Sequence, residues 1–318
     1  MSGRKRTLWL ALMLCAAVAP ARTGERIGHG GMSMSTEHDG PIDECRQLRV
    51  TFDGAEAARA EQTLSAPSPR GALKLRAPAN SGIFVRGGDR SDVSVTACKA
   101  AAAAQDLSRI EAAFENGELL ARGPEGRDWV VHFIVSAPRS AGLDLEVTNG
   151  PISVRGMSGS VAARAQNGPL GFEDSSGAIQ AEAKNGPISL KRCTGSVQAT
   201  AVNGPISVSG SGGDVSVTTQ NGPISVALSG SHWDGKLDAQ ARNGPLTLSL
   251  PEGYTSPVRV ESSGRSPFQC RARACEEARK TWDEESRLVE FGGSGSPVVR
   301  LSTVNGPVSI RSARPQEE

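Results

Sequence analysis

Along the middle of the chain, apolar residues alternate with small ones in short runs that recur at a nearly constant interval. Three and five residues after each Asn-Gly-Pro triplet stands an apolar side chain, with one small residue in between. Because successive side chains of a strand point to opposite faces, this alternation predicts strands with one buried face. The apolar pairs are Ile152/Val154, Leu170/Phe172, Ile188/Leu190, Ile206/Val208, Ile224/Val226, Leu246/Leu248 and Val308/Ile310.

A second strand is predicted within the same interval. A glycine stands ten residues after each of the first four asparagines, and an apolar residue follows two positions later, at Val161, Ile179, Val197 and Val215. Small residues, mostly alanine, occupy the next alternate positions. Each interval therefore indicates a strand, a turn, a narrower strand and a second turn.

The asparagines of the triplets define the period. Four steps of 18 residues are followed by one of 22 and one of 62, over Asn149, Asn167, Asn185, Asn203, Asn221, Asn243 and Asn305. One such unit cannot bury its own apolar face, whereas stacked units share a continuous core. We therefore predict an all-β, single-stranded parallel β-solenoid with 18-residue rungs. A meander of hairpins is the alternative, because Asn-Gly is also a hairpin signal.

In a stack of this kind, Asn-Gly-Pro is expected to turn the corner rather than to bind a ligand. Glycine tolerates a tight corner, and proline fixes the entry into the next strand but cannot donate to a ladder within it. Asparagine can bond the asparagines above and below it, so the triplets predict a structural turn ladder.

The rest of the chain is divided by composition. Three basic residues, the apolar run Leu8–Val18 and Ala19-Pro20-Ala21 predict a signal peptide, whose apolar run is too short to span a bilayer. We expect residues 1–21 to be the signal peptide and residues 22–44 to be a flexible tether. Residues 45–140 are expected to form an irregular, β-rich amino-terminal cap with a short helix over 100–114, and residues 141–250 the regular repeats. Residues 251–312 are expected to form degenerate rungs and a carboxy-terminal cap with a short helix over 271–285, followed by a tail at 313–318.

Composition and charge narrow the classes of partner. Aromatic residues make up only 4% of the chain, which fits a thin core. Without residues 1–21 the chain has 32 basic and 34 acidic residues, and this net charge of −2 gives no indication of nucleic-acid binding. No later segment is apolar enough to be transmembrane. The prediction is an exported protein, periplasmic or extracellular, and a lipid anchor at Cys15 is not favoured because bulky Leu14 precedes it.

Export permits disulfides between the remaining cysteines. Cys270 and Cys275 are close enough in sequence to close a small loop, and Cys45 and Cys98 could tie the amino-terminal region together. Cys193 would then be left over, although the sequence alone leaves the pairing open.

The Asn-Gly-Pro-(Ile/Leu/Val)-x-(Val/Leu) units carry a resemblance to a known family. Together with Val135-Ser136-Ala137-Pro138 before the first unit and Leu250-Pro251 after Asn243, they resemble a bacterial adhesin-like family with β-strand repeats, a domain of unknown function. The resemblance covers about Cys45 to Ser312. It implies an exported β-solenoid and carries no catalytic residues.

Candidate chemistry is sparse, and we predict no catalytic residue, no cofactor and no metal site. Glu173-Asp174 is the one carboxylate pair within the regular turns, where acidic side chains commonly bond the local backbone. Asp283-Glu284-Glu285 is interpreted as a solvated face. The turns lack the repeating Asp of calcium-binding coils, and no Cys/His spacing matches zinc. His29 and His38 are interpreted as part of a solvated linker.

Recognition is expected where the period breaks. The four extra residues of the 22-residue step fall near Ser231 and provide a candidate recognition loop of His232, Trp233 and Asp234. The alternative is that Trp233 folds back over a flank. A row of hydroxyls at Ser153, Ser189, Ser207 and Ser225 is expected to be an ordinary wet face.

The sequence thus predicts a non-enzymatic, adhesin-like protein that binds or organises a cell-envelope polymer or protein. Two alternatives remain open: a polysaccharide-cleaving enzyme that uses the flank of the stack, and an envelope-stress or signalling accessory that binds a membrane partner.

Overall fold

The computed structural model describes residues 27–29, 32–36, 40–126, 128–263, 266–293 and 296–313. The predicted signal peptide, Cys15 and His38 lie outside these residues, as do residues 314–318 of the predicted tail.

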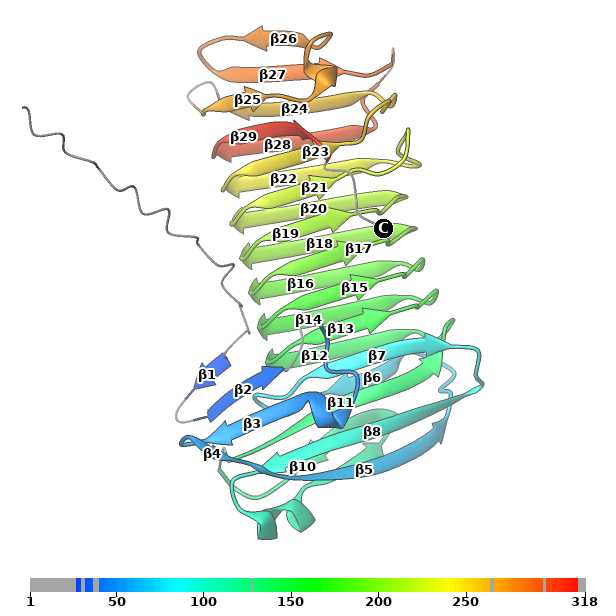
Figure 1. Cartoon of the computed structure of the whole chain (residues 1–318). Coiled ribbons are helices and arrows are strands. Elements are labelled where there is room, and N and C mark those ends of the chain that lie inside the picture. The colour runs from blue at the N-terminus through cyan, green and yellow to red at the C-terminus, as the bar shows by residue number, and fades with distance from the viewer. Residues whose placement is uncertain are drawn as a thin grey trace, which may run out of the picture.

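The protein is all-β and is dominated by two large, mostly parallel sheets that face each other (Figure 1). The first has thirteen described strands in the order β26 (Arg279–Trp282), β27 (Ser286–Phe291), β24 (Val258–Ser263), β28 (Val299–Asn305), β22 (Leu237–Asn243), β20 (Asp214–Asn221), β18 (Ser196–Asn203), β16 (Ile179–Asn185), β14 (Val161–Asn167), β12 (Leu143–Asn149), β6 (Leu73–Arg76), β10 (Glu118–Arg122) and β9 (Glu111–Glu115). We call it the thirteen-stranded sheet.

The second, the twelve-stranded sheet, follows the same axis. Its described strands are β25 (Phe268–Cys270), β29 (Val308–Ser312), β23 (Leu246–Leu250), β21 (Ile224–Ala227), β19 (Ile206–Ser209), β17 (Ile188–Lys191), β15 (Leu170–Glu173), β13 (Ile152–Arg155), β7 (Ile83–Gly88), β11 (Trp129–Pro138), β8 (Asp92–Ala101) and β5 (Ala58–Pro67). Between β12 and β23 the chain alternates between the two sheets, so each turn of the chain adds one strand to each.

The register of the middle strands follows the sequence period. Ile188 pairs with Ile206, and Ile206 pairs with Ile224, in parallel strands whose partners are 18 residues apart. Like residues therefore lie above like residues along the stack. The hairpin meander is wrong for this region, because the neighbouring strands from β12 to β23 are parallel.

The core is a continuous column between the two sheets. Alternate residues of both sheets point into it, so that Ile188 and Leu190 of β17 are buried together with Ala181 and Ala183 of β16. The alanines explain the narrowness of the stack, because small side chains on one sheet let the other approach closely. The outward residues between them are polar or small.

A second core lies at the amino-terminal end. Strands β1 (Ile27–His29), β2 (Met32–Thr36), β3 (Leu48–Phe52) and β4 (Ala55–Glu56) form a four-stranded antiparallel sheet. Leu48, Val50 and Phe52 pack on Phe84 and Val130, which the twelve-stranded sheet contributes. Part of the range 22–44, which was expected to be a flexible tether, is therefore paired into a sheet.

The two short helices that the sequence predicted are wrong as α-helices. Over 100–114 the chain forms the end of β8, a 3₁₀ turn η2 (Ala104–Arg109) and β9. Over 271–285 it forms a 3₁₀ turn η3 (Arg273–Cys275) and β26. Ala100, Ala101 and Ala112 are buried in the sheets, so tertiary packing overrides the helical propensity of alanine there.

The carboxy-terminal end has an inserted pair of strands. The red strands β28 and β29 lie between the yellow β22 and β23 and the orange β24 and β25, although they come last in the sequence (Figure 1). Val299 pairs with Leu237 on one side and with Val258 on the other, both in parallel. The 62-residue step to Asn305 is thus a single step in space.

Candidate functional site

The asparagines of the repeat form one hydrogen-bonded row along a corner of the stack. Each Nδ2 donates to the Oδ1 of the asparagine in the preceding layer, at 2.7–2.9 Å from Asn167 to Asn305, and Asn149 donates to Asn80 at 3.1 Å. Sequence reasoning missed Asn80, although it stands three residues before Ile83 as Asn149 stands before Ile152. The side-chain amides of these asparagines thus bond one another from layer to layer.

The glycine after each asparagine fits because the backbones approach closely at this corner. A Cβ atom on Gly204 would lie 2.0 Å from the carbonyl oxygen of Gly186, and one on Gly186 would lie 2.1 Å from that of Gly168. The corner therefore excludes every larger residue by contact with backbone that cannot yield.

Glu173 and Asp174 lie in a cluster of ion pairs at another corner. Arg155 Nη2 is 2.7 Å from Glu173 Oε2, Lys191 Nζ is 3.0 Å from Glu173 Oε1, and Arg192 Nε is 2.6 Å from Asp174 Oδ1. Burial opposes ionisation of Glu173, but hydrogen bonds from Lys191, Arg192 and Arg155 outweigh it and lower its pKa to about 2. A carboxylate held ionised in this way is unsuited to act as a general acid near neutral pH.

The inserted loop places its aromatic residue inside the protein. Trp233 is only 6% exposed, and its indole Nε1 donates to the Gly213 carbonyl at 2.9 Å. Of the two interpretations of the sequence, the structure matches the one in which Trp233 folds back over a flank, while recognition by the loop stays a prediction. His232 and Asp234 on either side of it remain exposed.

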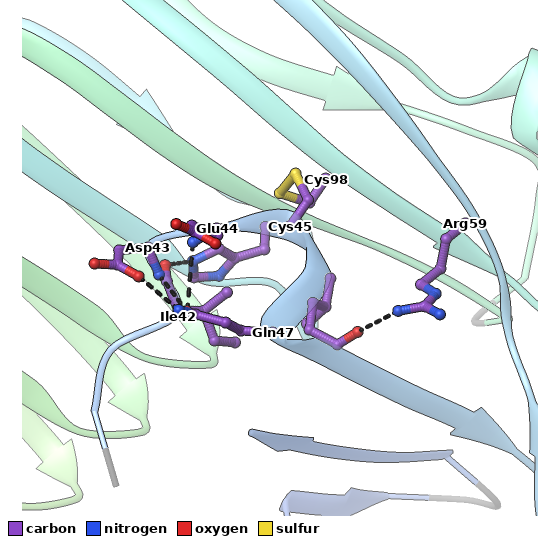
Figure 2. Close-up of a disulfide and its surroundings, with 9 residues drawn as sticks. Ile42, Asp43, Glu44, Cys45, Gln47, Arg59 and Cys98 are labelled. Carbon is purple, nitrogen blue, oxygen red and sulfur yellow. Dashed lines mark hydrogen bonds between the residues drawn. A yellow bond between two sulfur atoms is a disulfide. The ribbon is translucent and has the colours of Figure 1, made fainter. Parts of the chain in front are cut away.

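The cysteines pair as Cys45–Cys98 and Cys270–Cys275, the pairings that the sequence left open. Figure 2 shows the first of these joining the 3₁₀ turn η1 (Cys45–Gln47) to β8. Cys193 has a free thiol, and burial raises its pKa, so it is not poised to react.

His132 is a buried residue that no motif or spacing in the sequence indicated. Its Nε2 lies 2.9 Å from the Ile42 carbonyl, which can only accept, so Nε2 carries the hydrogen. Its Nδ1 is enclosed without a hydrogen-bond partner among the described residues. Burial lowers the pKa of His132 to about 4, which keeps the imidazole neutral at ordinary pH.

The remaining predicted residues lie on the surface. Ser189 and Ser225 are exposed on the twelve-stranded sheet, and Ser153 and Ser207 are partly so. Asp283 accepts hydrogen bonds from the backbone nitrogens of Glu285 and Ser286, which lower its pKa and make it a turn residue. The side chain of His29 lies outside the described residues.

An open hollow of about 910 Å³ lies near the carboxy-terminal end. Three segments form most of its walls: residues 250–258 from the end of β23 to the start of β24, 272–279 with η3, and 290–293 from the end of β27, and Pro297 and Ser312 complete them. Its lining includes four glutamates and two arginines, at Glu252, Glu276, Glu277, Glu290, Arg273 and Arg279.

The buried side of this hollow includes a tyrosine. Burial raises the pKa of Tyr254, and the nearby Ser256 hydroxyl opposes that rise. The Tyr254 hydroxyl is enclosed and has no partner in hydrogen-bonding geometry within the described chain.

Within the residues that the structure describes, no three His, Cys, Asp or Glu side chains are grouped so that they could hold a metal ion. In the same residues, no helix is long and apolar enough to cross a bilayer.

Comparison with known proteins gives distant likenesses only. No family model matches the chain, and no curated protein matches it. A crystal structure named "putative cell adhesion protein", from Clostridium sporogenes, aligns with 80% of this chain and all of its own at 11% identity and a TM-score of 0.25. One named "putative adhesin", from Bacteroides fragilis, aligns with 80% of this chain and 97% of its own at 11% identity and a TM-score of 0.28. One named "putative lipid binding protein", from Parabacteroides distasonis, covers the same shares at 11% identity and a TM-score of 0.23. TM-scores this low do not establish a shared fold.

Proposed function

We propose that the chain is an exported, non-enzymatic, adhesin-like β-solenoid that binds or organises a polymer or protein of the cell envelope. The observation that supports this most is a parallel, in-register stack with a disulfide-bonded segment at each end. Disulfides persist in exported proteins, and a rigid stack separates its two ends by a fixed distance. At about 4.8 Å per strand, thirteen strands extend over roughly 58 Å.

The repeats themselves contribute little to recognition in this proposal. Their inward side chains fill the core, and their asparagines bond one another, so only the outward faces and the two ends remain for a partner. The ends depart from the period and carry the irregular surface that specific contacts need. We therefore assign binding to the ends and structural support to the repeats.

The alternative of a polysaccharide-cleaving enzyme has less support. Cleavage of a glycosidic bond commonly needs one carboxyl that is protonated at working pH. Glu173 and Asp174 are both ion-paired with pKa values below the usual range. The alternative of an envelope-stress or signalling accessory shares the same fold and differs in its partner, which would be a membrane protein.

Expression of the complete chain in a bacterium, followed by fractionation, tests the proposal. We expect a shortened, processed form outside the cytoplasm, in which only one cysteine is alkylated after denaturation without reductant, since Cys193 is buried in the folded protein. The purified protein should retain an envelope polymer or protein and release no reducing ends from polysaccharides. A cytoplasmic protein with free thiols would contradict export, and sugar release that co-purifies with the protein would favour the enzyme.

A further inference from the structure

The hollow near the carboxy-terminal end differs from the other charged parts of the surface. Where Arg155, Glu173 and Lys191 share a corner, they pair with one another. Around the hollow, Glu252, Glu276, Glu277, Arg273 and Arg279 make no ion pair within the described chain, and all five are exposed. Carboxylates and guanidinium groups thus line one hollow with their hydrogen-bonding capacity unused.

The walls of the hollow are held in place. The Cys270–Cys275 disulfide closes a five-residue step immediately beside Arg273 and Glu276. The opposite wall is anchored by Trp233, whose backbone nitrogen donates to Ser256 Oγ at 3.0 Å. A site with rigid walls loses less conformational entropy when a ligand binds. Its volume of about 910 Å³ falls within the range of small-molecule sites.

The charges select among ligand classes. With four glutamates against two arginines, the lining has a net charge of −2, and only Glu290 is compensated nearby, by Arg259 at 3.5 Å. This sign disfavours phosphate-rich polymers and anionic headgroups. The exposed surface of the hollow is polar and apolar in similar parts, so a lipid tail placed there would leave the charged groups without partners.

We propose that this hollow binds a neutral, hydroxyl-rich glycan segment of the cell envelope. The proposal rests on the function proposed above and specifies its ligand class. A sugar hydroxyl both donates and accepts, so neighbouring hydroxyls can accept from Arg273 or Arg279 and donate to Glu252, Glu276 or Glu277. Hydrogen bonds to charged partners are the stronger kind, and they need no charge on the glycan.

Binding of defined probes to the processed protein tests the assignment. Cellohexaose, chitohexaose and maltohexaose serve as neutral glycans, spermine as a polycation and heparin as a polyanion, measured by calorimetry. The double variant Arg273→Ala/Glu276→Ala removes one donor and one acceptor from the hollow. The matched control Arg70→Ala/Glu125→Ala removes the same residue types from exposed positions outside the hollow.

We expect at least one hexasaccharide to bind the wild type and the control variant with equal affinity. The same hexasaccharide should bind the hollow variant at least tenfold more weakly, although the melting temperature of that variant is unchanged. Equal binding by both variants would overturn the hollow as the site. Binding of spermine or heparin alone, or of no probe, would overturn the glycan assignment. In that case capture of an envelope protein, with export intact, would still support the broader function.

Discussion

The asparagine ladder allows a graded test of how the stack is held together. Asn203 takes part in two of its bonds, donating to Asn185 at 2.9 Å and accepting from Asn221 at 2.9 Å. Asn203→Ala removes both. A hydrogen bond contributes about 1 kcal/mol net, and all three asparagines are exposed, so water can solvate the groups left behind. We therefore expect the free energy of unfolding to fall by about 1–2 kcal/mol.

The end of the ladder provides the matched control. Asn305 donates to Asn243 and accepts from no asparagine in the described chain, so Asn305→Ala removes one bond where Asn203→Ala removes two. Its loss should be about half as large. Urea unfolding followed by circular dichroism at 218 nm would measure both variants against the wild type. Equal losses, or no loss at Asn203, would refute the ladder as an additive source of stability.

Three further predictions concern other features of the fold. Gly204→Ala places a Cβ 2.0 Å from the Gly186 carbonyl and should abolish soluble expression, whereas Gly71→Ala, with no atom within 4 Å, should leave expression and melting temperature unchanged. His132 has a pKa of about 4 in the folded state and about 6.5 in the unfolded state, so the folded state binds fewer protons between these pH values. The free energy of unfolding should therefore fall by about 3 kcal/mol as the pH falls from 6.5 to 4. His132→Gln should flatten that part of the pH profile, and an unchanged slope in urea titrations would contradict the assignment. Replacing Cys45 and Cys98 by serine opens a loop with a separation of 53 residues and should lower the free energy of unfolding by about 4 kcal/mol. The same change at Cys270 and Cys275, whose separation is 5, should lower it by about 2 kcal/mol. Thermal melts with and without reductant would compare the two variants.

The sequence determined the repeated part of the fold more fully than its ends. Alternation at Ile206 and Val208 and the spacing of the asparagines predicted which residues face inward and which residues pair. That inference works because each strand contacts neighbours of nearly the same sequence, so local pattern and tertiary contact coincide. Asn80 was within reach of the same reasoning, since its distance from Ile83 repeats the pattern.

The ends could not be predicted in this way, because non-repeating contacts determine them. The alanines at 100–104 favour a helix locally, but pairing with β11 makes the first two part of a strand. Trp233 could have been exposed or buried, and its position depends on Gly213 and Ser256, which are remote in sequence. The hollow is formed by separate segments between residues 250 and 312 that share no motif, so no local signal indicated it.

The insertion of β28 and β29 has a consequence for the order in which the molecule can assemble. A chain that emerges with its amino end first can add each regular layer to the one before it as soon as that layer appears. Strands β24 and β25 cannot do so, because β28 and β29, the strands that connect them to the stack, follow 41 and 40 residues after them. The region 251–298 therefore joins the stack only after β28 and β29 have been synthesised. A partner that recognises this end would bind only molecules that contain the strands β28 and β29.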